Sequence, residues 1–107
     1  MGAIFDISMK ITNELPSLKV TDDILVTINN RKNNILLVQA MNEENERKPE
    51  GERLDDHEVI AKALQLLVGE SKAKAIEDLN LPMPEYTKLY RAIMGIAVSG
   101  EYKEETP

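Results

Sequence analysis

The feature that most constrains the fold is the region from residue 54 to residue 100, where apolar side chains recur every three or four positions. This spacing places them on one side of an α-helix and predicts a series of amphipathic helices. Asp55 or Asp56 can cap the first of these helices, which we expect over about residues 56–68. Gly69 then ends it, because glycine readily adopts the backbone conformation that closes a helix.

Two further helices are expected in the same region. A short helix, capped by Ser71, is predicted over about residues 71–79. Pro82 and Pro84 separate it from the last helix, since proline cannot continue a helix but fits the first turn of a new one. The last helix is therefore expected over about residues 84–99.

The first half combines short strands with one more helix. Residues 4–11 alternate between apolar and other side chains and are predicted to form a half-buried strand. Residues 24–28 place Ile24, Val26 and Ile28 on one face and are predicted to form a second strand, although Asp22-Asp23 could instead cap a short helix. From residue 31 to about residue 46 the spacing changes to that of an amphipathic helix, which Asn29 or Asn30 can cap.

Two segments are predicted to be irregular. Residues 43–53 hold no aliphatic side chain and are rich in glutamate, which indicates a flexible acidic loop. Residues 101–107 are expected to form a disordered tail. The chain of 107 residues is then a single domain. Its predicted class is mainly α (α+β), with a small N-terminal β-strand pair or hairpin followed by about four amphipathic helices.

Composition argues against several classes of protein. Nineteen acidic and thirteen basic residues give a net charge of −6, which repels the phosphates of nucleic acid. There is no cysteine to form a disulfide scaffold. The sequence has no apolar stretch near the roughly 18 residues that cross a membrane, and its N-terminus lacks the pattern of a signal peptide. We expect a cytoplasmic protein that is not secreted and binds neither nucleic acid nor membrane.

Few side chains could carry chemistry. His57 is the only histidine, and it lacks the second ligand four residues away that metal-binding helices use, so a surface histidine is the simpler interpretation. The paired carboxylates fall at predicted helix starts, in the loop or in the tail, where capping and solubility explain them. We therefore expect no enzyme, with no catalytic residue, cofactor or metal site.

The last helix carries an apolar stripe that could bind a partner. Tyrosine and methionine are favoured at protein interfaces, although most stripes of this kind belong to a core. A chain this small also holds more apolar helix face than one domain must bury, so a partner or a homo-oligomer is expected. The candidate partner-binding residues are Tyr86, Leu89, Tyr90, Ile93 and Met94.

Three segments in a fixed order carry a family resemblance. The first begins at Asn29 and reads NNRKNNIL, leading into a helix and then the polar acidic loop. The second begins at Leu54 and reads LDDHEVIAKALQLLVGE, and the third begins at Ile76 and reads IEDLNLPMPEY, before a closing helix that ends in Ser99-Gly-Glu. Over about residues 20–102 this order resembles the tail assembly chaperones of long-tailed phages and prophages of Gram-positive bacteria.

The resemblance implies a small, mainly helical protein without catalytic residues. Such a chaperone binds the hydrophobic, helical tape-measure protein and keeps it soluble in the host cytoplasm before the tail tube forms around it. Recruitment of tail-tube subunits is a further expectation from the family. Many of these chaperones also exist in a longer, frameshifted form, of which this chain would be the short counterpart.

Two other functions stay open on the sequence. A small acidic adaptor or regulator would bind a basic protein partner, and its complex would weaken steeply with salt. A structural head–tail component of a phage virion would remain in purified particles, whereas a chaperone would be missing from mature tails.

Overall fold

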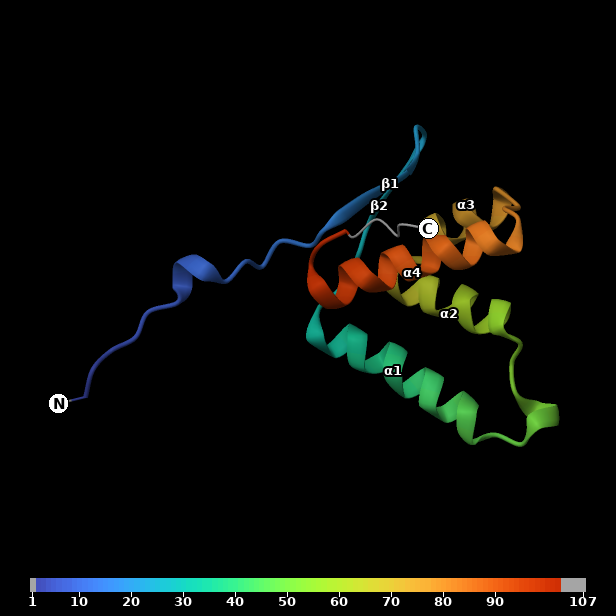
Figure 1. Ribbon diagram of the computed structural model, residues 1–107, viewed down its shortest axis with the longest axis horizontal. Helices are drawn as coiled ribbons and strands as arrows, with labels where there is room; N and C mark the ends of the chain where they lie inside the picture. The colour runs from blue at the N-terminus through green and yellow to red at the C-terminus, as the bar shows by residue number, and fades with distance from the viewer. Residues whose placement is uncertain (1, 103–107) are drawn as a thin grey trace.

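A hairpin followed by four helices makes up the body of the protein in the computed structural model, which describes residues 2–102 (Figure 1). This confirms the expected class, mainly α with a small N-terminal strand pair. Residues 103–107, the larger part of the predicted tail, lie outside the described residues. Within residues 2–102, none of the helices is long and apolar enough to cross a membrane.

The hairpin pairs strand β1, Ser17–Thr21, with strand β2, Ile24–Thr27, in antiparallel register. The Oγ1 atom of Thr21 accepts hydrogen bonds from the backbone N–H groups of Asp23 and Ile24, at 3.2 Å and 3.1 Å, and so closes the turn. Such a local turn brings the two strands together at low entropic cost. The second predicted strand is thus confirmed, at residues 24–27.

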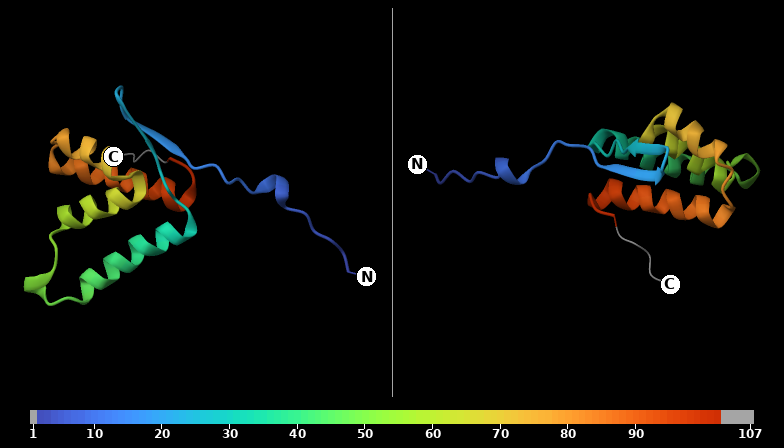
Figure 2. Two further views of the ribbon diagram at one scale, coloured as in Figure 1. Left: turned by 180° about the vertical axis from the view of Figure 1, so that it is seen from behind. Right: turned by 90° about the horizontal axis from the view of Figure 1, so that it is seen from above.

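The prediction of a strand over residues 4–11 is wrong. Residues 2–14 instead form an extended N-terminal arm that leaves the start of β1 and runs away from the helices (Figures 1 and 2). Its only regular element is a single 3₁₀ turn, η1, Ser8–Lys10. The alternating pattern is genuine, but a strand needs a backbone partner, and within residues 2–102 β1 and β2 pair only with each other.

The predicted acidic loop begins inside a helix. Helix α1 spans Lys32–Arg47, so the first residues of the segment 43–53 are helical. A short 3₁₀ turn, η2, Glu50–Glu52, lies in the connection to the next helix. Arg53 donates from Nε to the Lys48 carbonyl at 2.8 Å and from Nη2 to the Glu46 carbonyl at 2.9 Å. These hydrogen bonds order part of a segment that its composition had predicted to be flexible.

The helices of the second half lie close to their predicted positions. Helix α2 spans Asp56–Val68, α3 spans Glu70–Asp78 and α4 spans Met83–Ser99. Gly69 alone joins α2 to α3, with φ +88° and ψ 156°, a conformation open essentially to glycine only. Gly100 closes α4 in the left-handed conformation.

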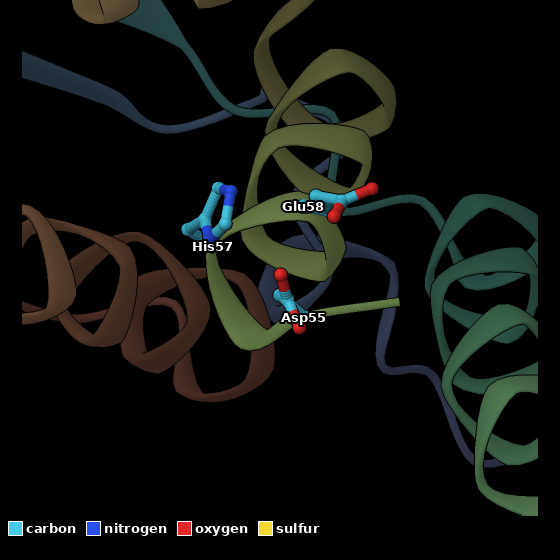
Figure 3. A group of neighbouring side chains, drawn as sticks. All are labelled: Asp55, His57 and Glu58. Atoms are coloured by element: carbon cyan, nitrogen blue, oxygen red, sulfur yellow. The ribbon is translucent and has the colours of Figure 1, made fainter. Parts of the chain in front are cut away.

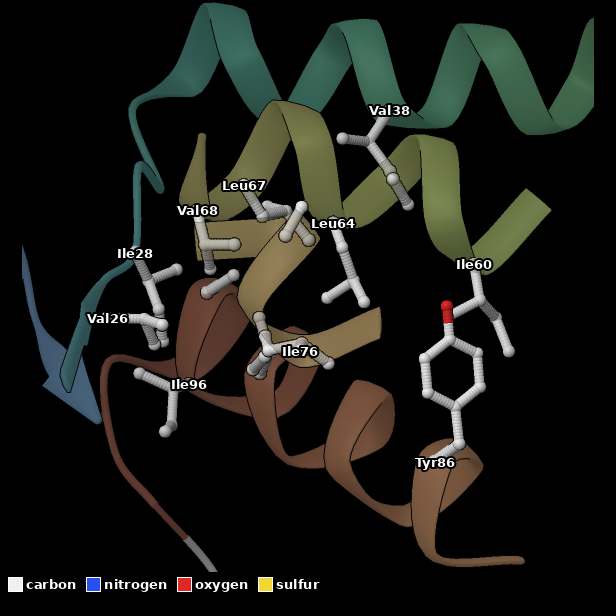
Figure 4. Close-up of a cluster of buried hydrophobic side chains, with 14 residues drawn as sticks. Val26, Ile28, Val38, Ile60, Leu64, Leu67, Val68, Ile76, Tyr86 and Ile96 are labelled. Carbon is white, nitrogen blue, oxygen red and sulfur yellow. The ribbon is translucent and has the colours of Figure 1, made fainter. Parts of the chain in front are cut away.

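The core is built around α2, which packs against α1, α3 and α4 (Figure 4). Val26 and Ile28 extend this core into the hairpin segment, where both are fully buried. In residues 2–102, every buried residue is apolar or is a tyrosine. The buried set is Val26, Ile28, Val38, Ile60, Ala63, Leu64, Leu67, Val68, Ala73, Ile76, Tyr86, Ile93, Ile96 and Ala97.

Hydrogen bonds fasten the hairpin and α1 to the end of α2. The backbone N–H of Asn29 donates to the Leu67 carbonyl at 2.7 Å. The Nδ2 of Asn34 donates to the carbonyls of Asn29 and Leu66, at 2.7 Å and 2.8 Å. These bonds satisfy backbone groups beside the helix terminus, where intrahelical partners run out. The hairpin is therefore held in place beside the C-terminal end of α2.

Candidate partner-binding surface

The predicted stripe on α4 is divided between core and surface. Tyr86 and Ile93 are buried, and Ile93 has no exposed surface at all. Leu89, Tyr90 and Met94 are half-buried and pack against the edge of the core. A partner could therefore reach only these last three side chains. The five residues do not form one open face, because successive residues of α4 point toward different neighbours.

Leu89 opens into a groove between the hairpin and α4, which we call the hairpin groove. Its volume is about 430 Å³. The apolar lining comes from both strand and helix, and its charged rim includes Glu85 and Lys88, whose side chains form an exposed ion pair at 3.7 Å. The lining residues are Leu18, Lys19, Val20, Thr21, Leu79, Leu81, Glu85, Lys88, Leu89, Ala92 and Tyr102.

Tyr90 opens into a second groove, bounded by α1, α2 and α4, which we call the helix groove. Its volume is about 560 Å³. Apolar residues from α2, α4 and the preceding connection form one part of it, and amides and charges of α1 form the opposite side. The lining residues are Asn42, Asn45, Glu46, Arg53, Leu54, Asp56, Val59, Ile60, Met83, Thr87, Tyr90 and Arg91.

Two asparagines of α1, Asn42 and Asn45, form the polar side of the helix groove. The Asn45 Oδ1 accepts a hydrogen bond from the Leu54 N–H at 2.9 Å. The Asn42 Oδ1 is buried and has no hydrogen-bond partner within residues 2–102. Burial raises the pKa of Tyr90, while the neighbouring Asn42 amide acts in the opposite direction. The Tyr90 phenol is therefore neutral and able to donate a hydrogen bond.

Tyr86 serves the fold more than the surface. Its hydroxyl donates to the Oε1 of Glu77 on α3 and so joins α4 to α3. Burial, reinforced by this hydrogen bond and by the charge of the Glu77 carboxylate, raises the pKa of Tyr86. This contact explains why a tyrosine can occupy the core, since its polar atom has a partner.

A cluster of potential metal ligands lies at the start of α2. One ligand atom each of Asp55, His57 and Glu58 lies within 4.8 Å of the others. The three side chains are exposed and leave the turn in different directions (Figure 3). They also surround the positive end of a helix dipole, which disfavours a cation. We assign no metal site to this cluster.

The two grooves are suited to holding a polypeptide segment. Each is open, partly apolar and flanked by charges, which is the usual character of a protein-binding surface. Sequence reasoning missed Leu18 and Val20, because Pro16 suggested a break in the strand pattern. Their alternation before the turn at Asp22-Asp23 was the signal that could have identified them.

Comparison with protein families, with characterised proteins and with solved structures finds no match to this chain. A functional assignment therefore rests on the two grooves and on the sequence pattern.

Proposed function

We propose that this protein is a phage tail assembly chaperone that binds the tape-measure protein and keeps it soluble in the cytoplasm of the host cell. In this role it acts by binding and catalyses no reaction. Recruitment of tail-tube subunits to the same complex is part of the proposal. Support comes from the order of segments over about residues 20–102 and from the acidic surface, with a net charge of −6.

The observation that carries the proposal is the helix groove. A tape-measure protein is a long helical client with apolar faces, and an amphipathic helix binds by laying its apolar side into a groove. The helix groove offers apolar side chains from α2 and α4, including Val59 and Met83, and Leu54 from the connection before α2. The opposite side of the groove is polar and carries Asn42, Asn45 and Glu46 of α1.

The surface charge fits the solubilising half of the role. Complexes of chaperone and client can still collide and aggregate after the apolar side of the client has been covered. The excess of acidic residues makes such complexes repel one another. Apolar burial would hold the client, and net charge would keep the loaded chaperone from aggregating.

The proposal can be tested with one pair of matched variants on α4. Met83 lies in the helix groove and is 53% exposed, whereas Val98 lies outside both grooves and is 71% exposed. We expect the wild-type protein and the Val98→Glu variant to keep a co-expressed tape-measure polypeptide soluble and to copurify with it. Met83→Glu should weaken this binding at least about tenfold, because it places a charge against the apolar client.

Three results would overturn the proposal. The first is a tape-measure polypeptide that ignores the purified protein, together with tails that assemble without the gene. The second is a complex whose affinity falls steeply with salt, which indicates the acidic adaptor that binds a basic partner. The third is recovery of this protein from purified mature particles, which indicates a structural head–tail component.

A further inference from the structure

The N-terminal arm exposes apolar side chains to an unusual degree. Ile4, Phe5 and Met9 are 94%, 90% and 95% exposed, and Ile7 and Ile11 are also largely exposed. Five such residues fall within an eight-residue segment, whereas isolated exposed apolar residues are ordinary. The radius of gyration of 16.6 Å exceeds the roughly 13 Å of a compact chain of this length, since the arm lies away from the body.

The sequence of the arm is that of a strand without a partner. Phe5, Ile7, Met9 and Ile11 alternate with other residues, so an extended arm would place all four on one side. The hydrogen bonds of its apolar part, residues 4–11, are local and exposed. The Asp6 Oδ1 accepts from the Ser8 N–H at 2.9 Å, and the Lys10 N–H donates to the Ile7 carbonyl at 2.8 Å. Such contacts open at little cost when a partner strand is offered.

A matching edge is present on the body. The sheet has two strands, so in residues 2–102 the outer edge of β1 has no strand beside it. Leu18 and Val20 of β1 are half-buried and face the hairpin groove, where Leu81 and Leu89 add further apolar surface. A two-stranded sheet is marginal by itself and gains stability from a third strand. The β1 edge and the groove beneath it thus fit an apolar strand.

The arm of the same chain is directed away from this edge. Pro16 restricts Leu15 to an extended conformation, and the Pro16 carbonyl is held by the Ile28 N–H at 2.8 Å. The Arg31 Nη1 donates to the Asn13 Oδ1 at 2.6 Å and fixes the next part of the chain. The arm therefore continues outward from the start of β1 (Figure 2). Folding back onto its own β1 would require a reversal within residues 12–15 and loss of the Asn13 contact.

We propose that the arm of one copy pairs antiparallel with the β1 edge of a second copy, and that the two copies exchange arms about a two-fold axis. Each arm then covers the hairpin groove of its partner with the side of the strand that carries Ile7 and Met9. The exchange makes the same contact twice, which is the rule for two-fold dimers, and it closes the exposed β1 edge of each copy.

The geometry of the exchange predicts a register. The arm and β1 form nearly one line, so two copies that run in opposite directions bring arm and β1 side by side at both ends. A regular strand through both segments would place odd-numbered arm residues and even-numbered β1 residues on opposite sides of the sheet. The exchange therefore requires the break at Pro16 to turn the side of the arm that carries Ile7 and Met9 toward the groove. A register with Met9 opposite Leu18 brings Ile7 beside Val20, where the pairing of β1 with β2 is irregular between Lys19 and Thr21, and it places the axis beside Asn13.

Cysteine cross-linking tests the pairing directly, because the full chain contains no cysteine. Two single variants, Met9→Cys and Leu18→Cys, are mixed and treated with a short thiol-to-thiol reagent. We expect a covalent dimer that contains one copy of each. The control replaces Met9→Cys by Ser8→Cys, whose side chain points to the opposite side of the strand. Its yield should be several-fold lower.

The oligomeric state provides the second measurement. Sedimentation of the full chain should show a monomer–dimer equilibrium, and Ile7→Asp should raise the dissociation constant at least about tenfold. Ser8→Asp adds the same charge on the solvent side of the paired arm and should leave that constant nearly unchanged.

Several outcomes would overturn the arm exchange. These are a chain that stays monomeric at high concentration, a dimer that Ile7→Asp does not weaken, and a mixture of Met9→Cys and Leu18→Cys that gives no more covalent dimer than the Ser8→Cys control. The experiments contain no tape-measure polypeptide, and the inference does not rest on the proposed function. Either proposal can therefore fail while the other stands.

Discussion

The helical body and the N-terminal arm use the same aliphatic residues with opposite results. In the body, Leu64 and Leu67 of α2 are almost wholly buried, whereas in the arm Ile4 and Met9 are almost wholly exposed. The side chains differ little in hydrophobicity. The difference lies in the backbone, because a helix satisfies its own hydrogen bonds and can present one apolar side to its neighbours. An isolated strand cannot do so.

This contrast shows how burial is achieved in a small chain. The helices supply their own backbone partners and need only pack side by side. The arm must first find a strand, and the hairpin offers one only at the outer edge of β1. Body and arm should therefore respond very differently to equivalent changes, and three predictions test that difference.

The largest effect is expected when a core leucine of the body is shortened. Leu67→Ala should lower the free energy of unfolding by about 2–5 kcal/mol, since Leu67 is fully buried between helices and little can move to fill the space. Urea unfolding followed by circular dichroism measures this change. Met9→Ala in the arm is the matched control and should change stability by less than about 0.5 kcal/mol. Equal effects would remove the distinction between the two regions.

A smaller effect is expected at the polar contact between α3 and α4. Tyr86→Phe should cost about 1 kcal/mol at neutral pH, through loss of the hydrogen bond to Glu77. The folded state raises the pKa of Tyr86 above the ordinary value near 10, so the unfolded chain ionises first. The stabilisation is therefore complete below about pH 10 and is lost as the pH rises above it.

The pH dependence gives this prediction its own check. The difference in stability between wild type and Tyr86→Phe should shrink as the pH rises above about 10, because only the wild type loses stability through this group. Tyr90 is present in both proteins and cancels in the comparison. A difference that stays constant over that range would mean that Tyr86 is not protected from ionisation by the fold.

The smallest effect on the isolated chain is expected when the arm is removed. Deletion of residues 2–12 should change the free energy of unfolding by less than about 0.5 kcal/mol when it is measured at a concentration where the full chain is monomeric. At high concentration the full chain should gain stability that the shortened chain does not gain, because association favours the folded state. A loss above about 1 kcal/mol in the dilute sample would mean that the arm packs on its own body.

Much of the helical body could be predicted from the sequence. Residues 56–68 were identified as a helix with the observed bounds, because Asp55 precedes the apolar pattern and Gly69 follows it. The break at Pro82 and Pro84 separated α3 from α4 in the same way. Capping residues, glycines and prolines act on the backbone beside them, so the helix ends can be located from the nearby sequence.

The less predictable features depend on distant partners. The end of α1 is close to the predicted one, but the folding of the next residues around Arg53 relies on hydrogen bonds that a charge pattern does not predict. The candidate stripe was located on the correct helix, but its division into buried Tyr86 and Ile93 and half-buried Tyr90 depends on how α2 and α3 approach. The arm has the sequence pattern of a strand, but within residues 2–102 no strand pairs with it.

Helix α4 stands between the two grooves, with Leu89 on one side and Tyr90 on the other. If both proposals hold, the client and the partner arm both contact α4, from opposite sides. Any shift of α4 that favours one ligand then changes the affinity for the other, and the coupling must be equal in both directions. Measuring the dissociation constant of the dimer with and without a client helix would determine whether client binding and dimerisation are cooperative, antagonistic or independent.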